Sequence, residues 1–199
     1  MKLKLKTIIL ITLCCLMLFP VPVQAASKKN VRAVKQVTYD FLEAASKYDQ
    51  SEINKCILNK NYQLFSKNSP ITKLIRKQHK KYFLYKITKV KVKKKTASVR
   101  VSVQFLSLMG AASYAYENME KYWIPNMNPL TVSSFDREFA TTVSNQLAPG
   151  GYEDDYLLTT SFTIPLVKKG GKWKIKKMTA AMEHVSSCEI YTILGYDYV

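Results

Sequence analysis

The sequence predicts an α+β fold in which N-terminal helices pack on a curved antiparallel sheet that carries a helical insertion. Apolar residues recur at the three-to-four-residue spacing of amphipathic helices from 31 to 78. Strict alternation of apolar and polar residues, the pattern of half-buried strands, replaces that spacing from 90 to 105 and returns from 158 to 175. Helical spacing between these two alternating segments places the insertion at about 107–155.

Three helices are expected to open the domain. The first covers about 31–48. Asp49, with Glu52 three residues later, has the spacing of a capping box and predicts the start of a second, short helix. Ser69 and Pro70 predict a third helix, with serine as its N-cap and proline in its first turn. The expected inward faces are Val34, Val37, Phe41, Leu42, Ala45 and Tyr48, then Ile53, Cys56 and Ile57, then Ile71, Leu74, Ile75 and Gln78.

Two hairpins are expected to follow. The first joins an alternating segment around Val90 and Val92 to the segment 97–105 through the lysine turn 93–95. The second joins 158–166 to Trp173 and Ile175 through Gly170-Gly171, because both glycines tolerate the positive φ of a tight turn. Each strand has one apolar face for the core and one face for solvent.

The insertion is expected to hold two helices, and the tail a last strand. One helix presents Met109, Ala112, Tyr116, Met119 and Trp123 and ends before Pro125. The other begins near Ser133 and presents Phe135, Phe139, Val143 and Leu147. Residues Ile190 to Leu194 predict the final strand.

Residues 1–25 read as a signal peptide. A basic start is followed by the apolar run Ile8 to Phe19 and by small or short side chains up to Ala25. The run is shorter than the ~20 residues that a spanning helix needs. We therefore expect cleavage after Ala25, one domain over 26–199 without a transmembrane segment, and a secreted or envelope-associated location. An uncleaved anchor or lipidation at Cys14 remains the alternative.

Charge is unevenly distributed along the chain. The formal net charge is +17, and residues 28–100 carry +16 of it while 101–166 carry −5. Such asymmetry predicts a polarised electrostatic field. The cations comprise 27 Lys and 4 Arg, and nucleic-acid readout relies on bidentate Arg. Export and lysine usage together weigh against a nucleic-acid partner.

The element order and three local patterns resemble the NTF2-like (cystatin-like α+β) superfamily. The patterns are the first helix with Phe41-Leu42 leading to Tyr48-Asp49, the long alternating strand to Phe105, and the closing Gly-Gly-Lys-Trp-Lys-Ile at 170–175. The resemblance implies a curved sheet forming a cone, with a concave pocket near Phe41, Tyr116, Trp123 and Trp173. The family includes both enzymes and binding modules, so the fold leaves the function open.

The lysines of the two hairpins are the best candidate binding residues. Those expected on a shared sheet face are Lys89, Lys91, Lys93, Lys172, Lys174 and Lys176. Such a face would attract an anionic wall polymer or acidic lipid headgroups. The alternative is that the lysines serve solubility alone.

Catalytic and metal signatures are weak, so we expect no enzyme activity, cofactor or metal. His79 falls in a basic run and is expected at the solvent-exposed surface, and His184 follows Glu183 in the tail. The acidic run 153–155 lacks calcium-loop spacing. Cys56 and Cys188 are either one disulfide of an oxidising compartment or two buried thiols.

The function expected from the sequence is therefore a secreted, non-enzymatic binding domain at the bacterial cell envelope. It would recognise a partner protein, an anionic wall polymer or a small ligand. The alternative is an enzyme that uses polar residues of the cone pocket for acid–base chemistry.

Overall fold

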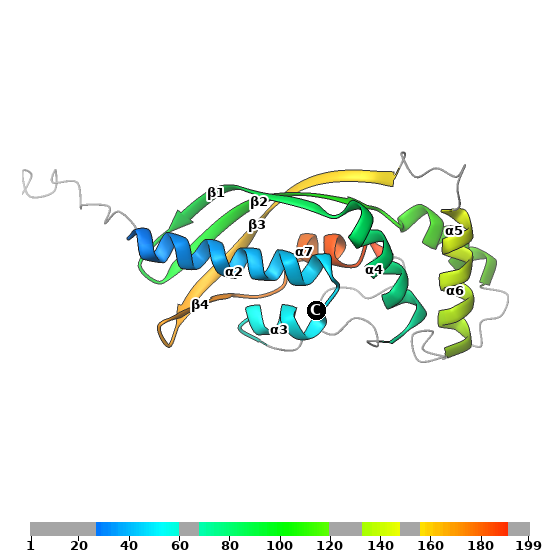
Figure 1. The fold of residues 1–199 in the computed structure, drawn as a ribbon, viewed down its shortest axis with the longest axis horizontal. Coiled ribbons are helices and arrows are strands. Elements are labelled where there is room, and N and C mark those ends of the chain that lie inside the picture. The colour runs from blue at the N-terminus through cyan, green and yellow to red at the C-terminus, as the bar shows by residue number, and fades with distance from the viewer. Residues whose placement is uncertain (1–26, 60–67, 120–132, 148–155, 191–199) are drawn as a thin grey trace, which may run out of the picture.

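The computed structural model describes residues 27–59, 68–119, 133–147 and 156–190, which form an α+β arrangement of six helices and one antiparallel sheet (Figure 1). In chain order the elements are α2 (Lys28–Ser46), α3 (Gln50–Cys56), α4 (Pro70–Tyr82), β1 (Leu84–Val92), β2 (Thr96–Leu106), α5 (Met109–Met119), α6 (Ser133–Gln146), β3 (Leu157–Lys169), β4 (Lys172–Ile175) and α7 (Ala180–Ser186). The expected signal peptide, Trp123 and the acidic run 153–155 lie outside the described residues. No helix in the described part is long and apolar enough to span a membrane.

The second and third helices begin where their capping residues predict, whereas α2 begins at Lys28, earlier than the expected start near 31. Asp49 accepts hydrogen bonds from the backbone N–H groups of Ser51 and Glu52, at 3.1 and 3.2 Å. Ser69 accepts one from the N–H of Thr72 at 3.1 Å, with Pro70 at the first helical position. These side chains satisfy N–H groups that have no partner inside the helix, so the local sequence determines where each helix starts.

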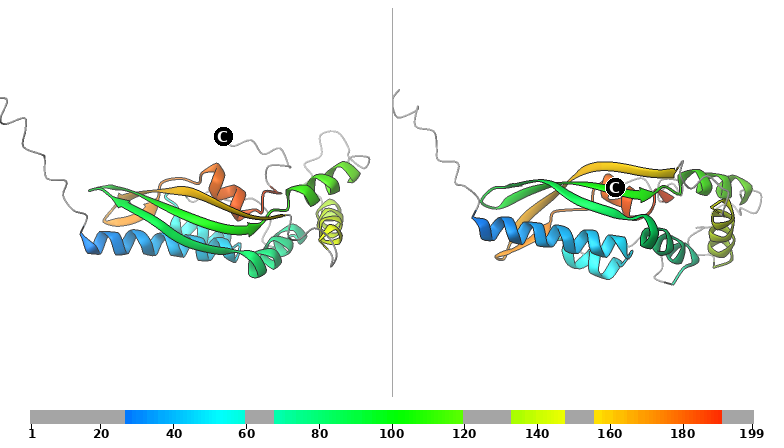
Figure 2. Two further views of the ribbon diagram at one scale, coloured as in Figure 1. Left: turned by 90° about the horizontal axis from the view of Figure 1, so that it is seen from above. Right: turned by 45° about the horizontal axis from the view of Figure 1, so that its top comes forward.

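The four strands form an open sheet in the order β1-β2-β3-β4, with every neighbouring pair antiparallel. The 170–171 turn has φ values of +55° and +77°, as expected for adjacent glycines in a tight hairpin. A register shift between Ile87 and Lys89 interrupts the β1–β2 ladder. The long helix α2 runs along one side of the strands (Figure 2).

The side of the sheet that faces α2 forms the main core. Val99, Val101 and Val103 are fully buried. Ile164 and Phe162, the register partners of the first two on β3, are buried beside them. Residues of α2, α3 and α7 complete this cluster. The opposite side of the sheet, called here the open face, carries the alternate residues of each strand, among them Ser98, Arg100, Ser102 and Gln104, which are exposed or half-buried.

A second apolar cluster joins the insertion helices to α4 at the far end of the molecule from the 170–171 hairpin (Figure 1). Phe139, Val143 and Leu147 of α6 are buried, as their spacing predicts. The expected stripe of α5 is wrong at Met109, which is exposed, and Tyr116 is partly buried. Ala112 is buried as expected, and Ala111 and Ala115 are buried beside it, because short side chains let α5 and α6 approach closely.

Three features of the C-terminal half and of α4 differ from expectation. Helix α7 was not predicted, since its seven residues are too few for a clear helical stripe. Ile190 is buried outside any strand, and the rest of the expected strand 190–194 lies outside the described residues. His79, expected in solvent, is only 2% exposed because α4 turns it toward Ala45 of α2.

The two cysteines do not form a disulfide. Cys56 ends α3 in the main cluster, whereas Cys188 belongs to the second cluster beside Leu108. Both are buried free thiols, which is the second of the two alternatives that the sequence left open.

Candidate anion-binding surface

The sheet register places the predicted lysines on the open face. Lys89 lies opposite Arg100, and Lys91 lies opposite Ser98, so both share the side of β2 that turns away from the core. On β4, Lys172 lies opposite Lys169 and Lys174 opposite Val167, on the same side of the sheet. The N–H of Lys176 donates to the carbonyl of Pro165 at 2.8 Å, which continues that alternation by one more residue pair. The cations of this surface, called the basic face, are Lys89, Lys91, Arg100, Lys169, Lys172, Lys174 and Lys176.

The two lysine-bearing edge strands are not direct neighbours. Strands β2 and β3 lie between β1 and β4, so the two lysine rows are about 14 Å apart at ~4.8 Å per strand. Both turns nevertheless meet at one end of the sheet, because the N–H of Lys168 donates to the carbonyl of Lys95 at 2.8 Å. The turn lysines 93–95 therefore join the two rows.

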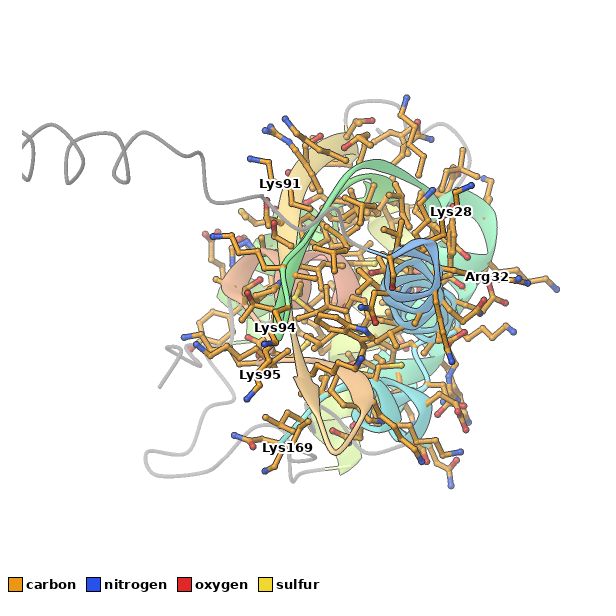
Figure 3. All side chains as sticks on the ribbon, turned by 90° about the vertical axis from the view of Figure 1, so that its left-hand side faces the viewer. Lys28, Arg32, Lys91, Lys94, Lys95 and Lys169 are labelled. Carbon is orange, nitrogen blue, oxygen red and sulfur yellow. The ribbon has the colours of Figure 1, made fainter. Side chains whose placement is uncertain are left out.

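The start of α2 brings further cations to this end. Asn30 accepts hydrogen bonds through Oδ1 from Lys168 Nζ at 3.2 Å and from Trp173 Nε1 at 3.4 Å. These contacts hold the first turn of α2 against the β3–β4 hairpin. Figure 3 shows the resulting end of the molecule ringed by the cations of three segments. The basic end is defined by Lys28, Lys29, Arg32, Lys93, Lys94, Lys95 and Lys169.

The strands that carry this positive charge supply no acidic side chain to compensate it. None of the four strands contains Asp or Glu. Two cation pairs, Lys89 with Arg100 and Lys169 with Lys172, lie directly opposite each other on neighbouring strands, an arrangement that destabilises a sheet. Lys28 and the next lysine occupy the first turn of α2, where the helix dipole also disfavours cations. Repulsive arrangements of charge that bring no structural benefit are typical of functional surfaces.

Lys174 of the basic face and the neighbouring Lys168 are already engaged within the fold. The ammonium of Lys174 donates to the backbone carbonyl of Lys55 at the end of α3. Lys168 lies 5.9 Å from the ring centroid of Trp173 besides its contact with Asn30. These two residues hold the hairpin in place, which leaves Lys172 as the freer lysine of β4.

Sequence reasoning missed several cations of this surface. Arg100 was not singled out, although the alternation of β2 already placed it on the solvent face. Lys28, Lys29 and Arg32 gave no such signal, because only the tertiary packing of α2 brings them beside the hairpins.

A shallow groove lies further along the open face. Leu84, Lys86, Ser102, Gln104 and Thr159 line it together with Tyr85, and it holds about 230 Å³. Typical small-molecule sites are concave and enclose roughly 300–1,000 Å³. The groove is therefore too small and too open to favour a small-ligand site over the basic end.

The four residues expected around a cone pocket are not gathered at one place. Phe41 and Trp173 are both buried in the main cluster, where they fill the core. Tyr116 packs against the second cluster. The remaining residue, Trp123, lies outside the described part of the chain.

Among the residues considered for acid–base chemistry, His79 is buried, Glu183 is half-buried and Asp40 is exposed. Burial lowers the pKa of His79 to about 4, against the weaker opposing effect of the carbonyls of Ala45 and Val185. Burial raises the pKa of Glu183 to about 6. Asp40 lies on the exposed side of α2 and accepts a hydrogen bond from Gln36 at 2.8 Å. In the described part of the chain no group of three His, Cys, Asp or Glu side chains is placed to hold a metal ion.

No family model, curated protein or solved structure matches the chain.

Proposed function

We propose that the domain is a non-enzymatic binding module of the bacterial cell envelope whose basic end holds an anionic wall polymer. A chain of regularly spaced phosphates, as in a teichoic acid, has the chemistry that such a surface would recognise. The proposal takes export of the chain and an NTF2-like architecture as its premises. The premise of export rests on residues 1–25. The premise of an NTF2-like architecture rests on the element order and the closing Gly-Gly-Lys-Trp hairpin.

The uncompensated charge at the basic end is the observation that supports this proposal most strongly. Cations from the start of α2, from the 93–95 turn and from the β3–β4 hairpin meet there without an acidic neighbour on the sheet. Opposed pairs such as Lys169 and Lys172 raise the energy of the free domain. An anionic polymer would relieve that repulsion on binding, because each phosphate replaces a cation–cation contact with an attractive one.

The test is retention on purified cell wall, with wall stripped of teichoic acid as the reference surface. The binding variant carries Lys93→Glu, Lys94→Glu and Lys169→Glu, three exposed residues of the basic end. A cation near an anionic surface contributes about 1 kcal/mol, so losing three should weaken retention by roughly a hundredfold or more. Wild-type retention should also vanish near ~0.5 M salt, where the Debye length is only a few Å.

The matched control carries Lys73→Glu, Lys77→Glu and Lys80→Glu, which change the net charge by the same amount on the exposed side of α4. This control should keep most of its affinity, since α4 lies away from the basic end (Figure 1). An equal loss of retention in both variants would show that binding depends on net charge and not on the position of these lysines. Unchanged retention in the basic-end variant would remove this surface as the binding site.

A further inference from the structure

A β-bulge in β1 decides which of its lysines face solvent. Ile87 lies opposite Val101 and Lys89 lies opposite Arg100, so Thr88 is an extra residue between two successive positions of β2. Thr88 donates its hydroxyl to the carbonyl of Arg100 at 3.0 Å. Strict alternation without the bulge would turn Lys89 toward the core. The bulge reverses the alternation and turns it to the open face.

The bulge also spaces the exposed lysines of β1 evenly. Lys86, Lys89 and Lys91 lie opposite residues 102, 100 and 98 of β2, and all three are exposed. The N–H of Lys93, also exposed, donates to the carbonyl of Thr96 at 2.7 Å, which places it one step further in the same direction. Each step is two residues of β2, or about 7 Å, so three steps cover about 20 Å. These four residues are called the lysine row, and Figure 3 shows its member Lys91 on the side of β1 away from α2.

The neighbouring strand places hydrogen-bonding groups beside the lysine row. Ser98 and Ser102 are half-buried on the open face, and Arg100 is exposed between them. Gln104 lines the shallow groove at which the row ends with Lys86. Hydroxyl and amide groups both donate and accept hydrogen bonds, and a guanidinium binds phosphate through two parallel N–H groups. The open face therefore offers cations at regular intervals beside groups that can bind the hydroxyls of a polyol.

The interval of the lysine row matches the repeat of one kind of anionic polymer. Two residues of extended backbone contain six covalent bonds and span about 7 Å. A phosphodiester chain with a three-carbon polyol between successive phosphates also has six backbone bonds per repeat, so its phosphates lie about 7 Å apart when it is extended. A five-carbon polyol gives eight bonds per repeat and a spacing of about 9 Å. Its phosphates would fall out of register with the lysines.

We propose that the open face binds a three-carbon polyol phosphate polymer lengthwise. Successive phosphates contact Lys93, Lys91, Lys89 and Lys86, while the polyol hydroxyls contact the serines of β2. Arg100 shares the phosphate of Lys89, because the two side chains lie on opposed residues of neighbouring strands. This inference rests on the proposed function, and it extends the contact from the basic end along β1 as far as the groove.

Two synthetic oligomers with equal numbers of phosphates, linked by three-carbon or by five-carbon polyols, test the register. They carry the same charge, so general electrostatic attraction does not distinguish them. The five-carbon oligomer engages fewer lysines of the row, and in calorimetric titration wild type should bind it about tenfold or more weakly than the three-carbon oligomer. Equal affinities, or tighter binding of the five-carbon oligomer, would overturn the proposal.

Variants test whether the lysine row sets this preference. Lys86→Gln with Lys89→Gln removes two members of the row and leaves the basic end intact, and this variant should bind the two oligomers equally. Lys73→Gln with Lys77→Gln, an equal change of charge on the exposed side of α4, should keep the preference for the three-carbon oligomer. A preference that survives in the row variant would show that other residues set it, and the proposal would be wrong.

Retention on cell wall separates this inference from the proposed function. If the basic-end variant loses retention while wild type binds both oligomers equally, the basic end stands as the binding site and only the register on the lysine row is wrong. If the basic-end variant keeps its retention, the proposed function fails, and the inference fails with it.

Discussion

Burial of His79 should make the stability of the domain depend on pH. The side chain is 2% exposed, and its Nδ1 lies 2.8 Å from the carbonyl of Ala45. A carbonyl only accepts hydrogen bonds, so Nδ1 carries the proton of the neutral ring. Burial lowers the pKa from 6.5 to about 4 because a charged imidazolium would lose its hydration.

The direction of the pH effect follows from the lowered pKa. Below pH 6.5 the unfolded chain binds a proton that the folded chain excludes, so acid favours unfolding. The contribution of His79 to stability is fully present above pH 6.5 and is lost progressively as the pH falls toward 4. The pKa difference corresponds to a loss of about 3 kcal/mol over that range.

Glu183 acts in the opposite direction over part of the same range. Its pKa is raised to about 6 by burial, so the folded state gains a proton first as the pH falls from 6 to 4.5. The side chain is half-buried, and solvent screening reduces the size of its effect. A comparison of two proteins that both keep Glu183 cancels this contribution.

The assay is urea unfolding of wild type and His79→Asn between pH 4 and 7.5 at constant ionic strength, followed by the fluorescence of the buried Trp173. Asparagine keeps a donor near the Nδ1 position but does not titrate. The free energy of unfolding of wild type should fall by about 3 kcal/mol more than that of His79→Asn. Parallel curves for wild type and His79→Asn would refute the buried, neutral imidazole.

The remaining predictions concern glycines and thiols. Gly110→Ala should destabilise the fold by about 1–3 kcal/mol, because the added Cβ would lie 2.7 Å from the ring of Tyr156; the stabilisation usual for alanine in a helix would contradict this packing. Gly171→Ala should cost about 1 kcal/mol in thermal or urea unfolding through its φ of +77° alone, since the space around it is open, and Gly171→Asn should cost less. Burial raises the pKa of Cys56 to about 11 and that of Cys188 still further, so peptide mapping after alkylation at pH 8 should find both unmodified in the native protein and both modified after unfolding. A bridged peptide pair in non-reduced protein would refute the free thiols.

The sequence by itself determined those parts of the fold that depend on neighbouring residues. Asp49 and Ser69 mark helix starts because a capping side chain reaches only two or three residues along the chain. The glycine pair 170–171 marks a hairpin because few other residues adopt its backbone angles. Alternation along 97–105 identified the buried face of β2, because the side-chain period of a strand is two.

Only the tertiary structure decided which distant residues meet. His79 lies in a basic run, and its burial follows from the docking of α4 against α2, which leaves no trace in the local pattern. Arg32 joins the hairpin lysines only because Asn30 contacts Lys168 across the fold. The thiols of Cys56 and Cys188 stay apart because they are buried in two separate apolar clusters. Contacts between distant segments depend on how whole faces pack, and that choice is not encoded within any short stretch of the chain.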